Sequence, residues 1–528
     1  MKKRVALILV LLVFLILIIV YFFAKSRDQH DQGVFLDGHL IGEIDSIITI
    51  NNHHYISYDL LVENDLLDSY FDGNDSTIYL YQNYERFTVV LDEKNSAVIQ
   101  TDDNNSVYIS TNYLLGKLEN GYTLNAVGSS VFIEKNYSIL INDKAIWLYD
   151  SPRSIFGRRE KIKSNSEIIQ YESDGEWILG RVGDQVGLLK RLYLNTSETI
   201  EEKGLFQSDK RKQVIMAWDF FTRQPTTFVE GPLYPSLNVV SPTWHAIDKE
   251  TRQYEDWYLS EYMKHYSDNR IEVWPAFSNS FDPVLTSEIL NDASSRQNLI
   301  DQIIGISKNN GYRGINIDFE NIYLEDKDVF AVFIRDLYLE TRKENIIMSV
   351  DVTILSSSPT WSLFYDREIV GRYSDYVVLM AYDERTRPEH GIGPIASLPW
   401  VETGIVGLMD YVPASKIVLG LPFYTRLWET INANGGVTYD VTALKLPSAD
   451  AFISANGFVI TYDEEAGQNY GEVQIDNIKY QIWIEDEISL QNRLDLVHKY
   501  GLSGVAAWAL DYSKPEMWQL IDDNLSEQ

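Results

Sequence analysis

The chain from residue 213 to residue 528 predicts a (β/α)8 barrel. Compact apolar runs recur eight times along it, and helical segments separate most of them, which is typical of parallel strands joined by crossover helices. A length of about 310 residues also suits this barrel. The predicted strands are 214–218, 237–240, 271–277, 315–319, 346–352, 376–381, 417–421 and 504–510, and the predicted helices are 257–265, 296–308, 328–343, 401–412 and 490–500.

A doubly wound open sheet is the alternative fold. No glycine-rich phosphate-binding loop follows the first predicted strand, which disfavours it. One connection, residues 430–486 between the seventh and eighth strands, is too long for a single helix and contains strand-like runs of its own. We expect an inserted α+β subdomain there, forming one wall of a substrate cleft at the C-terminal rim of the barrel.

The N-terminal residues predict a membrane anchor. Basic residues at positions 2–4 precede an unbroken apolar run from Val5 to Ala24, which is long enough to cross a hydrocarbon core as a helix. The basic flank favours a cytoplasmic N-terminus. A cleaved signal peptide competes with this interpretation, but its apolar core is shorter and ends in small residues, whereas this run ends in bulky aromatic residues. We expect residues 1–30 to form a single-pass anchor in the cell membrane, with the rest of the chain, including the predicted barrel, extracellular.

Residues 36–135 are rich in Ile, Val, Tyr and Thr, with Asn, Asp and Gly between them, which indicates short strands and turns. A weak internal repeat is present, because residues 51–57 and a following leucine pair recur as residues 104–110 and a second leucine pair. A strand, a turn and a short helix used twice would explain it. The repeat resembles those of the domain named after the amino terminus of copper amine oxidase.

Residues 138–195 form a second small module in this interpretation. The turn Asp174-Gly175-Glu176-Trp177 and the later glycines Gly183 and Gly187 resemble the bacterial Src-homology-3-like small barrel. The usual pattern has Gly-Trp after the second turn, whereas this sequence has Gly187 followed by Leu188. A spacer or wall-binding module is expected.

Composition excludes several functional classes. The formal net charge of -32 argues against nucleic-acid binding, because contacts to phosphates need Lys and Arg. The chain has no cysteine, which excludes disulfides, zinc–thiolate sites and thiol nucleophiles.

The stretch 311–321, Gly-Tyr-Arg-Gly-Ile-Asn-Ile-Asp-Phe-Glu-Asn, is the predicted active site. In a strand, Asn316, Asp318 and Glu320 share one face, and buried carboxylates are costly unless they are paired or used. The two acids end the fourth predicted strand, where catalysis occurs in such barrels, and each is close enough to bias the ionisation of the other. A metal site is the alternative, but these residue types without clustered His are not specific for any ion.

Residues 314–320 also resemble the signature of glycoside hydrolase family 18, the chitinase-like family, whose pattern is Asp-Gly-x-Asp-x-Asp-x-Glu. Three further motifs are similar in the expected order, at residues 379–383, 420–426 and 507–511. Arg313 and Asn316 stand where the pattern usually has aspartates. The asparagine at position 316, together with the sequence at 393–400, is similar to the pattern of one subgroup of the family. This subgroup contains spore-cortex and cell-wall N-acetylglucosaminidases from endospore-forming bacteria.

The resemblance implies retaining hydrolysis assisted by the substrate. Glu320 would protonate the glycosidic oxygen while the carbonyl oxygen of the sugar's 2-acetamido group attacks the anomeric carbon. Asp318 would accept the acetamido N–H, and Tyr382 would hold the acetamido oxygen. Asn316 would hydrogen-bond Asp318 without being able to take its proton, which predicts a changed pH profile.

Substrate binding is assigned partly by resemblance and partly by position. Trp508 would form the floor beneath the distorted sugar, because an aromatic face suits the C–H face of a pyranose. The other predicted substrate contacts, from the matching motifs and the end of the third strand, are Asp383, Met380, Tyr424, Arg426 and Asn279.

The sequence therefore predicts a hydrolase of β-1,4 bonds in a polymer that contains N-acetylglucosamine, with no cofactor and no metal. Peptidoglycan is the leading substrate, and chitin or chitooligosaccharides come second within the same chemistry. A catalytically silent, lectin-like wall protein is the alternative from a different class. The presence of Glu320, Asp318 and Tyr382 together argues against it, since carbohydrate binding alone does not need the acid.

Overall fold

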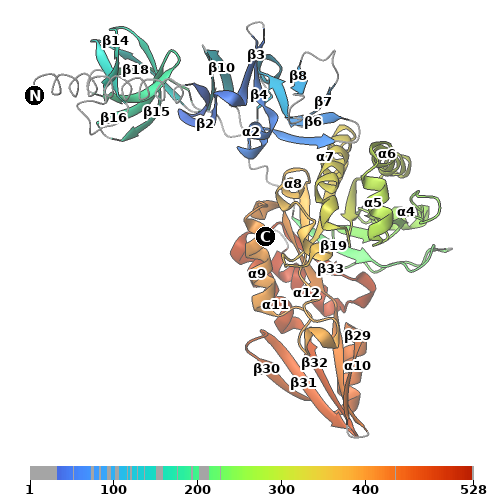
Figure 1. Cartoon of the computed structure of the whole chain (residues 1–528). Helices are drawn as coiled ribbons and strands as arrows, with labels where there is room; N and C mark the ends of the chain where they lie inside the picture. The colour runs from blue at the N-terminus through green and yellow to red at the C-terminus, as the bar shows by residue number, and fades with distance from the viewer. Residues whose placement is uncertain are drawn as a thin grey trace, which may run out of the picture. The chain divides into compact units, whose positions relative to one another are not determined.

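The computed structural model describes residues 32–525, with gaps at 51–52, 73–75, 83–84, 92–96, 101–105, 116, 119–121, 128, 136, 150–157, 175, 192–193, 201–212, 226 and 434–435. The chain divides into two compact units, Met1–Ser208 and Asp209–Gln528, and each is considered by itself (Figure 1). The predicted anchor at residues 1–30 lies outside the described residues. Among the helices that are described, none has the length and apolarity needed to cross a bilayer.

The first part of the N-terminal unit contains the predicted internal repeat. Strand β4 runs directly into helix α2, strand β9 runs into helix α3, and the two strands pair antiparallel. Leu61 of α2 and Leu114 of α3 are both buried in one shared core. The elements of this part are β1 (Gly33–Leu36), β2 (His39–Glu43), β3 (Ile47–Ile50), β4 (His53–Ser57), α2 (Tyr58–Glu63), β5 (Asp68–Asp72), β6 (Thr77–Gln82), β7 (Glu85–Val90), β8 (Val98–Gln100), β9 (Val107–Ser110), α3 (Thr111–Leu114), β10 (Thr123–Val127) and β11 (Ser130–Glu134).

The second part of this unit is a seven-stranded antiparallel sheet in the order β14-β13-β17-β16-β15-β12-β18. The hairpin between β16 and β17 turns at Gly183, whose φ of 62° favours glycine. Leu148, Ile168 and Leu189 are fully buried in its core. Its likeness to a Src-homology-3-like barrel stays a prediction. The strands are β12 (Tyr137–Asn142), β13 (Ile146–Tyr149), β14 (Arg158–Ile162), β15 (Glu167–Asp174), β16 (Trp177–Val182), β17 (Gln185–Lys190) and β18 (Leu194–Ile200).

The C-terminal unit contains the predicted (β/α)8 barrel. All the strand pairs of its central sheet are parallel, and β19 pairs with both β33 and β20, so the first and last strands are neighbours. Gly504 opens β33 where a Cβ atom would lie 1.9 Å from the Val214 carbonyl oxygen, so only glycine permits this close approach. The strands are β19 (Val214–Asp219), β20 (Val239–Pro242), β21 (His245–Ala246), β22 (Glu272–Val273), β23 (Ala276–Ser278), β24 (Gly314–Asp318), β25 (Ile347–Thr353), β26 (Tyr376–Met380), β27 (Ile417–Pro422) and β33 (Gly504–Trp508).

The third barrel strand is divided into β22 and β23 by Trp274 and Pro275. Proline has no N–H to donate to a sheet, but the two residues still join the neighbouring strands. The backbone N–H of Trp274 donates to the carbonyl oxygen of Val240 at 2.9 Å, and the carbonyl oxygen of Pro275 accepts the backbone N–H of Asn316 at 3.0 Å. The ring of strands is therefore continuous through this break.

Helices follow the barrel strands and cover the outside of the sheet (Figure 1). Capping side chains explain where several begin: Asp292 accepts the N–H of Ser295 at the start of α6, which ends at Gly311 in the left-handed conformation. Three of the helices, α5, α8 and α12, have no counterpart in the sequence prediction. The helices are α4 (Ser260–Asp268), α5 (Pro283–Leu290), α6 (Ala293–Asn310), α7 (Lys327–Lys343), α8 (Arg367–Arg372), α9 (Leu398–Met409), α11 (Glu487–Tyr500) and α12 (Pro515–Leu525).

An antiparallel sheet in the order β29-β28-β32-β31-β30 is inserted between β27 and β33. It begins at Tyr424 rather than at the predicted residue 430, because β28 follows β27 after the single residue Phe423. Helix α10 packs on one face of the sheet, where Leu427 and Ile482 are buried. Its elements are β28 (Tyr424–Ala433), β29 (Gly436–Lys445), α10 (Leu446–Asn456), β30 (Val459–Asp463), β31 (Gln468–Ile475) and β32 (Ile478–Ile484).

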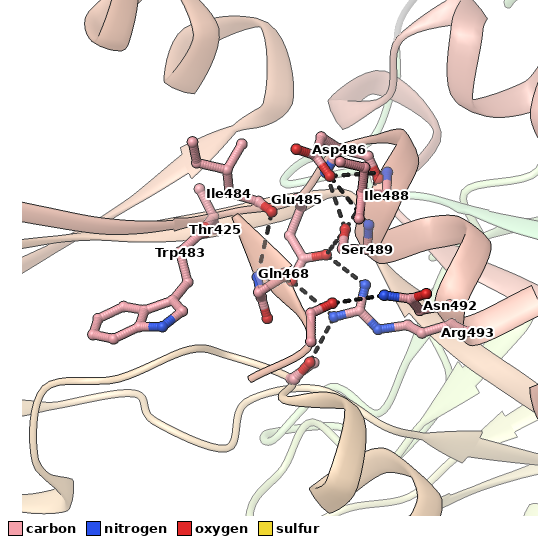
Figure 2. Close-up of polar contacts among 12 residues, drawn as sticks. Thr425, Gln468, Trp483, Ile484, Glu485, Asp486, Ile488, Ser489, Asn492 and Arg493 are labelled. Carbon is pink, nitrogen blue, oxygen red and sulfur yellow. Dashed lines mark hydrogen bonds and ion pairs between the residues drawn. The ribbon is translucent and has the colours of Figure 1, made fainter. Parts of the chain in front are cut away.

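A buried ion pair joins the inserted sheet to the barrel (Figure 2). Arg493 of α11 donates two hydrogen bonds to the Glu485 carboxylate, at 2.5 and 2.9 Å, and the two side chains are 3% and 1% exposed. Ser489 and Gln468 donate to the same carboxylate at 2.9 and 3.3 Å. Arg493 also donates to the carbonyl oxygen of Ala396 at 2.6 Å, in the loop after β26. One cluster thus holds the inserted sheet, α11 and that loop together.

Candidate active site

The predicted catalytic acids lie at the C-terminal end of β24. All five residues of this strand are buried, as expected of a strand covered on both faces. Asn316 is fully buried, Asp318 is 8% exposed, and Glu320 is half-buried just beyond the end of the strand. The strand therefore carries its polar side chains towards the end of the barrel where catalysis takes place in this fold.

Asn279 holds the backbone of Glu320 in place. Its Oδ1 accepts the Glu320 N–H at 3.0 Å, and its Nδ2 donates to the Glu320 carbonyl oxygen at 2.7 Å and to the Thr286 hydroxyl at 2.9 Å. We expected Asn279 to bind sugar, but the side chain is fully buried and its amide groups are engaged within the protein. Asn279 is a positioning residue for the acid, and only the fold places it next to Glu320.

Glu320 has the protonation behaviour of a general acid. Burial raises the pKa of its carboxyl to about 8, and the negative charges of Asp318 and Asp383 add to the shift. Near neutral pH the carboxyl group therefore retains its proton. A protonated carboxylic acid at this position can donate to a leaving group.

Asp318 is perturbed in the same direction. Burial, and then the charge of Asp351, raise its pKa well above the ordinary value. Its Oδ1 is buried and accepts no hydrogen bond from any residue that the structure describes. An acceptor in this state is costly unless a ligand or a shared proton satisfies it.

Asn316 does not contact Asp318 in the way the sequence suggested. Its Nδ2 donates to the Asp351 carboxylate at 2.7 Å and to the Ser349 hydroxyl at 3.0 Å, and its Oδ1 accepts the Trp218 indole N–H at 2.9 Å. The expected bond to Asp318 is therefore wrong, because both amide protons are directed to the neighbouring strand β25.

Asp351 is a member of the site that sequence reasoning missed. It is 1% exposed, and burial raises its pKa well above the ordinary value, with a further contribution from the charge of Glu320. A signal was present, because Ser349, Asp351 and Thr353 alternate with apolar residues along a buried strand. This is the same pattern that identified the acids on β24.

Tyr365 was also missed. Its hydroxyl donates to the carbonyl oxygen of Phe319 at 2.8 Å, which fixes the peptide between the two acids. Burial raises its pKa well above the ordinary value, and the charges of Glu320, Asp318 and Asp351 contribute. Because Tyr365 lies in the loop between β25 and α8, no local pattern marked it.

The loop after β26 brings a second polar group to the site. Tyr382 is buried and packs edge-on against Tyr424, with ring centroids 6.2 Å apart. The Asp383 carboxylate accepts the Tyr424 hydroxyl at 2.7 Å and the Arg426 guanidinium at 2.9 Å. Met380 is buried at the end of β26. The predicted residues of two separate motifs are thus brought together.

Trp508 ends β33 and is half-buried. Its ring contacts Trp218, the partner of Asn316, with centroids 5.8 Å apart, and Phe220 with centroids 5.5 Å apart. This aromatic group connects the predicted floor of the sugar site to the polar side chains of β24. No group of three or more His, Asp or Glu side chains in the described part of the chain is arranged to hold a metal ion.

A family comparison agrees with this geometry. The model of the glycosyl hydrolases family 18 matches residues 195–513. The chain belongs to this family. It is therefore a glycoside hydrolase, and the match extends over every strand of the barrel.

Individual relatives resemble between about half and two thirds of this chain. The uncharacterized glycosylase YvbX of Bacillus subtilis is 27% identical over 48% of this chain and 74% of its own length. The cortical fragment-lytic enzyme of Bacillus subtilis is 26% identical over 47% of this chain and 58% of its own length. The crystal structure of the spore cortex-lytic enzyme SleL of Bacillus megaterium aligns with a TM-score of 0.52 at 21% identity, over 62% of this chain and 77% of that one. The structural likeness supports the barrel fold.

Proposed function

We propose that this chain hydrolyses the β-1,4 bond that follows N-acetylglucosamine in peptidoglycan, by substrate-assisted retaining catalysis. The observation that carries the proposal is the pairing at the end of β24. Glu320 has a pKa of about 8, and Asp318, two residues before it, has a buried oxygen without a hydrogen bond from the described residues. One group is suited to donate a proton, and the other to accept an N–H.

In the first step, Glu320 transfers its proton to the glycosidic oxygen. The acetamido carbonyl oxygen of the same sugar attacks the anomeric carbon, the bond to the leaving sugar breaks, and a positive oxazolinium ring forms. Asp318 accepts the acetamido N–H and stabilises this charge. In the second step, Glu320 takes a proton from water, whose oxygen attacks the anomeric carbon and reopens the ring.

Other residues orient the sugar. The Tyr382 hydroxyl would hold the acetamido oxygen in line, and the Trp508 ring would lie beneath the pyranose. Asp383 is bonded to Tyr424 and Arg426, so it is held in a fixed position from which it can both accept a sugar hydroxyl and raise the pKa of Glu320. This last effect links substrate binding to the protonation of the acid.

The choice of peptidoglycan rests on the relatives that are named for the degradation of spore cortex. The test is to incubate the purified chain with bacterial cell wall and, separately, with chitin oligomers, and to identify the fragments by mass spectrometry. Muropeptides with N-acetylglucosamine at the reducing end are expected from the wall. Cleavage of chitin oligomers alone would favour a chitinase, and sugar binding without cleavage would favour a lectin-like protein.

A matched pair of variants tests the role of the acid. Glu320→Gln removes the proton donor and should abolish the release of fragments. Glu325→Gln makes the same change on an exposed side chain five residues away and should leave activity unchanged. Fragment release that persists in Glu320→Gln would refute the assignment of the acid.

We further propose that residues 1–30 anchor the enzyme in the cell membrane with the barrel on the extracellular side. The proposal rests on the basic and apolar pattern of these residues. Recovery of the full chain in the membrane fraction, with the barrel digested by protease added to intact protoplasts, is the expected result. Full recovery in the aqueous fraction after high-salt washing would contradict it.

A further inference from the structure

Two buried acids lie side by side on neighbouring barrel strands. β24 and β25 are parallel, and Asn316 lies opposite Ser349. Two residues further along both strands, Asp318 therefore comes opposite Asp351, on the same face of the sheet. Neighbouring strands are about 4.8 Å apart. The Asp318 and Asp351 side chains are 8% and 1% exposed, so solvent screens the electrostatic interaction between the two carboxyl groups only weakly.

Each of these acids has a buried oxygen that accepts no hydrogen bond from the described residues. Oδ1 of Asp351 accepts the Asn316 amide at 2.7 Å, whereas its Oδ2 and the Oδ1 of Asp318 accept none from the residues described. Two adjacent buried carboxylates cannot both remain charged at low cost, and the usual solution is one proton shared by the pair. The orphaned oxygens are the atoms available for that proton.

We propose that Asp351 is a positioning residue that shares one proton with Asp318. The family pattern has an aspartate at the position of Asn316, and in this chain Asp351 on β25 provides that second acid instead. Asn316 holds the other oxygen of Asp351 and fixes the carboxyl group. The replacement of an acid by an amide at 316 therefore moves the second acid to the next strand. The consequence for catalysis rests on the function proposed above.

The proton moves within the pair during the reaction. When Asp318 must be negative beside the oxazolinium ring, its O–H bond breaks and an O–H bond forms on Asp351, so the net charge of the pair stays at one negative unit. This avoids a second buried charge next to Glu320. The groups that face or perturb Asp351 are Asn316, Asp318 and Glu320 of the β24 end, Trp218 of β19, Tyr365 of the loop after β25, and Tyr382 of the loop after β26.

A reciprocal exchange tests the proposal. Asp351→Asn removes the second acid and should lower kcat about 50-fold with little change in KM. Asn316→Asp adds a third acid and should move the pH optimum. The double variant Asn316→Asp/Asp351→Asn restores one acid beside Asp318, and its kcat should recover to within about 5-fold of the wild type. Asp375→Asn is the matched control, because Asp375 precedes β26 at the opposite end of the barrel and bonds the Met348 N–H at 3.0 Å.

Two kinetic outcomes would overturn the role of Asp351. One is an Asp351→Asn variant with a kcat and a pH profile equal to those of Asp375→Asn. The other is a double variant no more active than Asp351→Asn, provided that both unfold at the same temperature as the wild type. If Asp351→Asn does not fold, the role of Asp351 is tested by the kcat of the double variant and by the pH profile of Asn316→Asp. An inactive double variant that folds, or an unchanged pH profile, would then overturn it.

A second measurement does not depend on activity. Carbon-13 NMR of protein labelled at the aspartate carboxyls follows the protonation of Asp351 directly, with Asp351→Asn identifying the signal. We expect the Asp351 carboxyl to stay protonated at pH values at which the exposed aspartates have already lost their protons. The signal of Asp318 should change over the same pH range as that of Asp351. Independent titration near the ordinary range refutes the shared proton. An inactive wild type that still shows the coupled titration refutes only the proposed function.

Discussion

The stability of the barrel should fall with rising pH because of Glu320. Its pKa in the folded protein is about 8, against 4.5 as the ordinary value. Between these two values the folded state binds more protons at this site than the unfolded state, so stability is lost as the pH rises. This rise in the pKa corresponds to a loss of about 3 to 6 kcal/mol in the free energy of unfolding at pH 8 and above.

Glu320→Gln removes this penalty because glutamine resembles the protonated acid and cannot ionise. The variant should exceed the wild type in stability by less than about 1 kcal/mol at pH 5 and by about 3 to 6 kcal/mol at pH 9, while its kcat falls about 1,000-fold or more. The assay is urea unfolding followed by tryptophan fluorescence at both pH values. Glu325→Gln, which alters an exposed side chain, controls for the loss of one charge.

An equal stability gain at pH 5 and pH 9 would refute the reasoning, since it would have no link to ionisation. So would the absence of any gain at pH 9. A much larger gain at pH 9 than at pH 5, together with the loss of activity, would show that the same carboxyl group lowers the stability of the protein and serves the reaction.

Three further outcomes are expected. Asn279→Ala should lower kcat about 100-fold with little change in KM, because the Glu320 backbone loses both of its bonds to this side chain and the acid is misplaced; steady-state kinetics on the folded variant measures this. Asp383→Asn should move the alkaline limb of the kcat/KM profile to lower pH, because its charge helps to raise the pKa of Glu320; an unmoved limb would contradict this. Arg493→Met should destabilise the protein by about 3 to 5 kcal/mol by leaving Glu485 buried without its partner, and Arg493→Met/Glu485→Met should recover most of that loss in urea unfolding.

Much of the barrel was predictable because its signals are local. An apolar run followed by a helical segment is written in consecutive residues, and all eight predicted strands are present. The helices that were missed, such as α8 and α5, have only six and eight residues, too few for a clear period. The start of the inserted sheet was also obscured, since β28 continues from β27 with one residue between them.

The sequence by itself determined which side chains face the same way. Because the side chains of a strand alternate between its faces, Asn316 and Asp318 had to share a face wherever the strand was placed, and the same alternation continued by two residues predicted the side of Glu320. It also determined the family, because four motifs occur in order along one chain.

Only the tertiary structure decided the partners of those side chains. Asp351 lies beside Asp318 because a crossover helix returns the chain to form the next parallel strand, and Asn279 reaches Glu320 from the third strand. The register between such strands depends on how the helices pack and not on any short stretch of sequence. That is why the acid on β25 and the contact made by Asn316 were found only once the strands lay side by side.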